Sequence, residues 1–176
     1  MPDAPGLELL AQEIDARHEG AVDGTSFEHD QATLIVDPER ILDALGFLKD
    51  APGHEYRFLS SLHGVDYLPA EPRFAVHYEL LNMPRVERVR VKAMLADPGP
   101  GSLPELDSCI ELFGAAEFQE REVYDFFGIL FRGHPDLRRI LMPEDYVGWP
   151  QRRDFPVGGD PVIFTNTERT IPGWVR

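Results

Sequence analysis

Apolar residues repeat at helical spacing in two stretches near the start of the chain. The first stripe, over residues 7–17, consists of Leu7, Leu10, Ala11 and Ile14. Spacings of three, one and three residues place these side chains on one helix face, so we expect a helix that ends by Gly20. A second helix is expected after Asp37 and Pro38, which suit an N-cap and a first helical position. Its buried face would consist of Ile41, Leu42, Leu45 and Leu48.

Alternating apolar and polar residues predict the strands. A short strand is expected over 33–36, and three more over 56–59, 74–80 and 88–93. A short loop separates the last two, which favours an antiparallel hairpin. Its polar face would place Glu79 opposite a basic row, which consists of Arg88, Arg90 and Lys92. This row is either a solvated sheet face with cross-strand ion pairs or a docking surface for an acidic partner.

Helical sequence resumes after Pro104, is broken near Gly114, and continues to about Phe127, where Gly128 can end it. The order of elements, without strict strand–helix alternation, predicts an α+β fold: a two-layer domain with a mixed, mostly antiparallel sheet covered by helices. This domain would occupy residues 1–142. Regular periodicity then stops, and residues 143–176 are expected to form an extended Pro/Gly-rich docking arm.

Composition narrows the possible partners. Of the 176 residues 43% are hydrophobic and 27% charged, as in a globular domain, and the net charge is −14. Phosphate binding needs clustered basic residues, so nucleic acid and a direct contact with an anionic membrane are disfavoured. There is no run of 18 apolar residues that could span a bilayer. If the protein sits at a membrane, another chain must hold it there.

Residues that could perform chemistry are scarce. The single cysteine, Cys109, excludes an internal disulfide and a self-contained iron–sulfur or thiolate zinc site, and its apolar context suggests a buried thiol. The six histidines lack metal-ligand spacing, and no dinucleotide-binding glycine motif is present. We therefore expect no catalytic, cofactor-binding or metal-binding residue in this chain.

One dense charged block lies within the last predicted helix. Arg121 stands four residues from both Glu117 and Asp125, so we expect it to bridge the two carboxylates. Glu122 and Asp125 could also be an acid–base pair, but the neighbouring Arg121 would lower both pKa values, which disfavours catalysis.

Aromatic residues surround the same helix, which therefore needs cover on more than one side. They are Phe118, Tyr124, Phe126 and Phe127. The cover could come from the chain's own tail or from another polypeptide. Both tryptophans, Trp149 and Trp174, lie in the tail among prolines and arginines. Since Trp and Arg are frequent at interfaces, the tail is expected to lie along another surface, although it could also pack on its own domain.

The charged block also resembles a known family. Glu120-Arg121-Glu122-x-x-Asp125-Phe126-Phe127-Gly128, followed by His134-x-x-x-Arg138-x-Ile140-Leu141, is similar to the signature of the C-type (30 kDa-type) subunit of proton-translocating NADH–quinone oxidoreductase, respiratory complex I. The resemblance covers roughly residues 30–156. A departure is Phe118, where the family usually has Trp.

The resemblance implies a non-catalytic core subunit of the peripheral arm, which acts as an enzyme only as part of its complex. It would contact the D-type subunit, which helps to form the quinone site, and adjacent iron–sulfur subunits on the cytoplasmic side of the cell membrane. FMN and the iron–sulfur clusters would lie in the partners. The interface residues would be Glu120, Arg121, Glu122, Asp125, Gly128, His134, Arg138, Arg139, Trp149, Arg152, Arg153 and Asp154. Two alternatives remain: a homologous scaffold subunit of a membrane-bound hydrogenase or other donor-specific quinone reductase, and a free-standing soluble enzyme.

Overall fold

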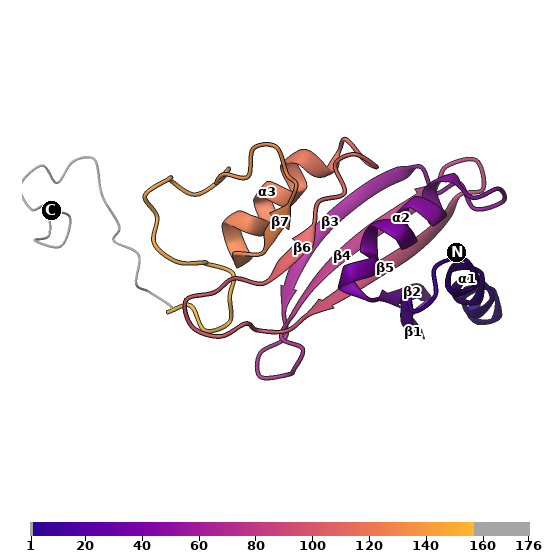
Figure 1. Ribbon diagram of the computed structural model, residues 1–176, viewed down its shortest axis with the longest axis horizontal. Coiled ribbons are helices and arrows are strands. Elements are labelled where there is room, and N and C mark those ends of the chain that lie inside the picture. Colours follow the sequence, from indigo (N-terminus) through magenta and orange to yellow (C-terminus); the bar gives the residue numbers. More distant parts are fainter. Residues whose placement is uncertain (1, 157–176) are drawn as a thin grey trace, which may run out of the picture.

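The computed structural model describes residues 2–156 of the chain (Figure 1). Five strands form the main sheet in the order β1-β2-β5-β4-β3. Their bounds are β1 Val22–Glu28, β2 Gln31–Val36, β3 Phe58–Asp66, β4 Phe74–Asn82 and β5 Glu87–Leu95. Strands β2 and β5 are parallel and the other neighbours antiparallel. With its helices this sheet confirms the predicted α+β fold.

The predicted hairpin is β4 and β5, and its register places Glu79 opposite Arg90. The Arg90 Nε donates to the Glu79 carboxylate at 2.5 Å. Cross-strand pairing of opposite charges, one of the two expectations for the basic row, therefore holds for Arg90.

All three α-helices pack on the apolar face of the sheet (Figure 1). They are α1 Ala4–Arg17, α2 Ile41–Asp50 and α3 Ala116–Phe127, with a short 3₁₀ turn, η1 Pro38–Arg40, before α2. The stripe of α1 is buried as expected. In α2 the buried face differs at one position, because Ala44 is buried while Leu42 is 38% exposed. Asp37 accepts the N–H of Glu39 at 2.9 Å and caps the turn before α2.

The helix predicted from Pro104 is wrong in its first part. Residues Glu105–Asp107 form strand β6, which pairs in parallel with β7, Leu130–Arg132, and α3 begins only at Ala116. The partner strand lies beyond α3 in the sequence, so local periodicity could not reveal this pairing. Strand β1 was also missed, because its residues, VDGTSFE, show no apolar alternation.

Candidate functional site

Residues 134–156, which we call the wrapping segment, run beside α3 in the same direction as the helix (Figure 1). At the first turn of α3, the His134 Nε2 lies 3.0 Å from the Glu117 carbonyl oxygen. One turn later Arg121 donates to the carbonyls of Arg138 and Arg139 at 3.2 and 3.1 Å. Arg121 thus holds the segment's backbone, and the predicted bridge from Arg121 to the carboxylates of Glu117 and Asp125 is wrong.

Asp125 forms the centre of this contact and is fully buried. One carboxylate oxygen accepts Arg139 at 2.8 Å. The other accepts three successive backbone N–H groups, those of Ile140, Leu141 and Met142, at 3.0, 2.7 and 2.8 Å. Burial alone would raise the pKa of Asp125, but these donors outweigh it and hold the pKa below its usual range. These donors favour the ionised form of the carboxylate.

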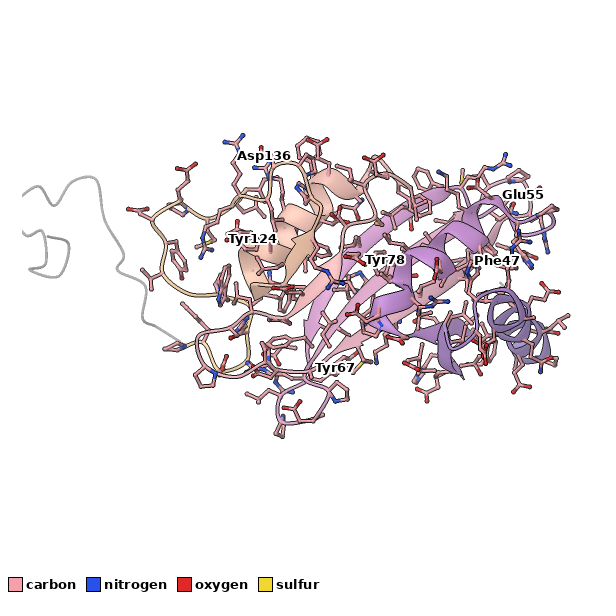
Figure 2. All side chains as sticks on the ribbon, viewed as in Figure 1. Phe47, Glu55, Tyr67, Tyr78, Tyr124 and Asp136 are labelled. Carbon is pink, nitrogen blue, oxygen red and sulfur yellow. The ribbon has the colours of Figure 1, made fainter. Side chains whose placement is uncertain are left out.

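The C-terminal end of α3 receives cations and a tryptophan from the segment. Gly128 ends the helix with a φ of 67°, and a side chain there would collide with the indole of Trp149. Arg152 donates to the Phe127 carbonyl at 2.6 Å, and Arg139 lies 4.6 Å over the Trp149 ring. Positive side chains at a helix C-terminus stabilise its unpaired carbonyls. Trp149 also packs edge-on against Tyr124, which is labelled on α3 in Figure 2.

A second buried carboxylate, Glu120, faces the opposite way, toward the loop after β6. It accepts the hydroxyl of Ser108 at 2.6 Å and the backbone N–H of Cys109 at 2.8 Å. Burial raises the pKa of Glu120, and it raises the pKa of the neighbouring Cys109 thiol as well. Cys109 is therefore an inert buried thiol, in agreement with its sequence context. Glu120 and Asp125 hold α3 from two sides.

The end of the wrapping segment is fixed by a buried arginine. Arg73 contacts Asp66 at 2.9 Å, Asp97 at 2.8 Å and Asp154 at 2.8 Å. Asp66 also accepts the backbone N–H of Arg153 at 2.9 Å. Burial would raise the pKa of Asp66, yet Arg73 and the backbone donors lower it to about 2. This cluster joins the loop after β3, the loop after β5 and the segment.

Sequence reasoning singled out most of these residues but not all of their partners. Asp66 and Arg73 both lie within residues 30–156, which resemble the family, but nothing in the sequence marked Arg73 as a partner of Asp66. The structure brings eight of the candidate residues together around α3: Glu120, Arg121, Asp125, Gly128, His134, Arg139, Trp149 and Arg152. Two more, Arg153 and Asp154, meet Asp66 and Arg73 at the end of the wrapping segment. Glu122 is exposed, and Arg138 forms a surface pair with Asp136 at 2.9 Å.

The part of the predicted arm that the structure describes, 143–156, lies against its own domain. Its Trp149 packs on Tyr124, so the tail supplies one side of the cover that α3 needs. Trp174 lies outside the described residues, and the division at residue 142 stays a prediction. Among residues 2–156 no group of three or more histidine, cysteine or acidic side chains could hold a metal ion.

Helix α3 and the wrapping segment carry apolar side chains that nothing covers within the described chain. Phe118 on α3 is 57% exposed, and Leu141 and Val147 on the wrapping segment are 61% and 88% exposed. Apolar groups displayed on a unit whose backbone is held by buried charges are typical of a protein–protein interface.

Comparison with known proteins identifies the family of the chain. Residues 34–161 match the family "Respiratory-chain NADH dehydrogenase, 30 Kd subunit", and so cover more than half of the chain. The chain belongs to this family. It is the C-type, or 30 kDa, subunit of NADH–quinone oxidoreductase, complex I, and lies in the peripheral arm.

Curated relatives agree with the assignment. The C-type subunit of NADH–quinone oxidoreductase from Roseiflexus castenholzii is 46% identical over 148 residues, which are 84% of this chain and 83% of the relative. The corresponding protein of Herpetosiphon aurantiacus is 44% identical over 138 residues, 78% of either chain. In the described chain, 2–156, no helix is long and apolar enough to cross a membrane.

Solved structures share the fold. A trypsin-resistant fragment of Nqo5 is 32% identical, with a TM-score of 0.60 over 74% of this chain and 98% of the fragment. A chain of an archaeal membrane-bound sulfane sulfur reductase gives a TM-score of 0.67 over 85% of both chains. At 22% identity the second comparison shows a common fold only.

Proposed function

We propose that this protein is a non-catalytic scaffold that docks on the D-type subunit, which helps to form the quinone site, and on adjacent iron–sulfur subunits. FMN and the iron–sulfur clusters belong to those partners. The scaffold holds their spacing, because electron transfer and quinone access need cofactors placed to within about an ångström, and such precision needs rigid support from the surrounding protein. It lies at the cytoplasmic side of the cell membrane through its complex.

The docking surface we assign is the outer side of α3 and the wrapping segment. This assignment is supported by two features that occur together. The buried Asp125 carboxylate binds Arg139 and three backbone N–H groups, a set of contacts that we call the clamp, and exposed apolar side chains lie on the same surface. Because Asp125 binds three consecutive N–H groups of residues 140–142, the Leu141 side chain is presented outward in one fixed direction. A surface ordered before binding costs less conformational entropy when a partner covers it.

The test is to place a charge on this surface without disturbing the clamp. Leu141→Asp changes an exposed side chain, while its backbone bond to Asp125 remains. We expect the variant to fold normally and its recovery with the complex to fall about tenfold or more, since a buried unpaired charge is costly at an interface. The matched control is Met83→Asp, which changes an apolar side chain of similar exposure, 63%, in the β4–β5 turn.

A second variant tests the charged part of the surface. Arg138→Glu reverses an exposed cation whose ion-pair partner, Asp136, is itself exposed, so the fold should tolerate it. Release of the protein from its complex is expected, whereas Arg57→Glu, at another exposed position, should leave assembly unchanged. Normal recovery of both Leu141→Asp and Arg138→Glu with full quinone reductase activity would overturn the assigned surface.

A further inference from the structure

The face of the sheet that the helices leave open carries a hollow of about 350 Å³. Its floor comes from β5 and its neighbours: the register sets Thr33 of β2 beside Arg90, and His77 of β4 beside Lys92. Tyr67, which lies in the loop after β3 (Figure 2), also lines the hollow. The complete lining consists of Ser26, Glu28, His29, Gln31, Thr33, Ile35, Tyr67, His77, Arg90 and Lys92.

Two cationic side chains, Arg90 and Lys92, lie in the lining of this hollow. Lys92 has no ion-pair partner among the residues that the structure describes, and its ammonium lies 4.5 Å from the centre of the Tyr67 ring. Arg90 is paired with Glu79 through its Nε. Glu28 is the one carboxylate of the lining. In a chain of net charge −14, two cations at one concave site stand out as a local feature.

A buried histidine, His77, belongs to the same lining. His77 is 6% exposed, and its Nε2 lies 3.2 Å from the Tyr67 hydroxyl, while its Nδ1 has no partner within the described chain. Burial, the stacked His63 and the two cations lower the pKa of His77 to about 3, so the ring is neutral at physiological pH. When Tyr67 donates to Nε2, the ring proton sits on Nδ1 and needs an acceptor.

We propose that this hollow receives a carboxylate side chain, an Asp or Glu, from another subunit of the complex. Lys92 is a cation of the lining without an ion-pair partner among the described residues, and a carboxylate would accept from it and from neighbouring hydroxyl groups. The lining is almost entirely polar, whereas sites for small organic ligands are mainly apolar. One unpaired cation suits a single carboxylate of a protein segment, whereas a nucleic-acid backbone needs clustered basic residues. The inference rests on the scaffold function proposed above.

The matched experiment compares two basic residues of β5. Arg88 points to the same face as Lys92 but is exposed and lies outside the hollow. Lys92→Glu should weaken retention of the protein in the purified complex about tenfold or more in a salt wash, since charge reversal at a close pair costs this much. Arg88→Glu and the conservative Lys92→Arg should behave like wild type. Unchanged melting of the isolated variants shows that folding is intact.

A zero-length carbodiimide cross-link identifies the occupant. In the assembled complex it should join the Lys92 amine to an Asp or Glu of a different subunit, as found by mass spectrometry. A cross-link only to Glu28, or to a second copy of this chain, would overturn the inference, as would normal retention of Lys92→Glu. If Leu141→Asp releases the protein and Lys92→Glu does not, this inference fails while the scaffold function stands. If neither variant releases it, the assigned docking surface fails as well.

Discussion

The two ends of the sheet are held by different forces. At the end formed by β1 and β2, α1 covers the sheet. Here α1, and α2 beyond it, contribute aliphatic side chains such as Leu10, Ile14 and Leu45, all buried. At the other end, the wrapping segment is joined to α3 through Asp125 and to the loops after β3 and β5 through Arg73, and both side chains are buried and ion-paired.

The difference teaches how an aperiodic segment acquires a single conformation. Aliphatic packing is non-directional and tolerates exchange of similar shapes. A buried carboxylate is satisfied in one arrangement only, because every donor must reach it at hydrogen-bond distance. Residues 134–156, which have no helix or strand of their own, are positioned by such directional contacts. The polar end should therefore depend on pH and on single partners, and the aliphatic end should not.

The largest expected effect comes from removing the central acceptor. Asp125→Ala leaves Arg139 and three backbone N–H groups without their partner, and should cost about 3 to 5 kcal/mol of unfolding free energy. Urea denaturation measures the loss, and hydrogen exchange at residues 140–142 should become fast. Asp136→Ala, which breaks only an exposed pair, should cost less than about 0.5 kcal/mol. Wild-type exchange rates in Asp125→Ala would refute the clamp.

A smaller effect is expected from acid. The pKa of Asp66 is about 2 in the folded chain against 3.8 ordinarily, so the unfolded state binds its proton at higher pH. Above pH 4 the lowered pKa of Asp66 contributes about 2 kcal/mol to the free energy of unfolding. This contribution is lost as the pH falls toward 2. Asp125, whose pKa is also lowered, acts in the same direction.

Urea unfolding between pH 2 and 6 measures this loss. In Asp66→Asn, the free energy of unfolding should fall less steeply as the pH drops from 4 to 2. Leu45→Ala, a change at the aliphatic end, should lower the whole curve by about 2 to 4 kcal/mol without altering its shape. The raised pKa of Glu120 changes the free energy of unfolding in the opposite direction, and it does so at higher pH. The loss of stability below pH 4 can therefore still be measured. The same steepness in Asp66→Asn as in the wild-type protein would contradict the role of this cluster.

The smallest effect is expected at the N-terminus. Asp3 caps α1 by accepting the N–H of Gly6 at 2.8 Å. Asp3→Ala should lower stability by about 1 kcal/mol, as for other N-caps, with Glu8→Ala on the exposed side of the same helix as a neutral control. Thermal unfolding measures both. A loss as large as that of Asp125→Ala would show that polar contacts matter equally at the two ends.

Much of the fold and of the site could be read from the chain alone. The stripe of α1 and the β4–β5 hairpin follow from local period, and the block from Glu120 to Gly128 marked the family. The partners within the block could not be read, because spacing suggested that Asp125 meets Arg121, four residues away. In the structure Asp125 meets Arg139 instead, since the segment returns along α3 and offers closer donors.

The sequence by itself determined the local elements, the absence of a recognisable reaction motif, and membership of the family, because each depends on residues close together or in fixed order. Tertiary structure alone decided the pairing of β6 with β7, the burial of Glu120 and Asp125, and the hollow beside Lys92. Each of these brings together groups from distant parts of the chain, and an electrostatic or hydrogen-bond partner is defined by distance in space rather than by position in sequence.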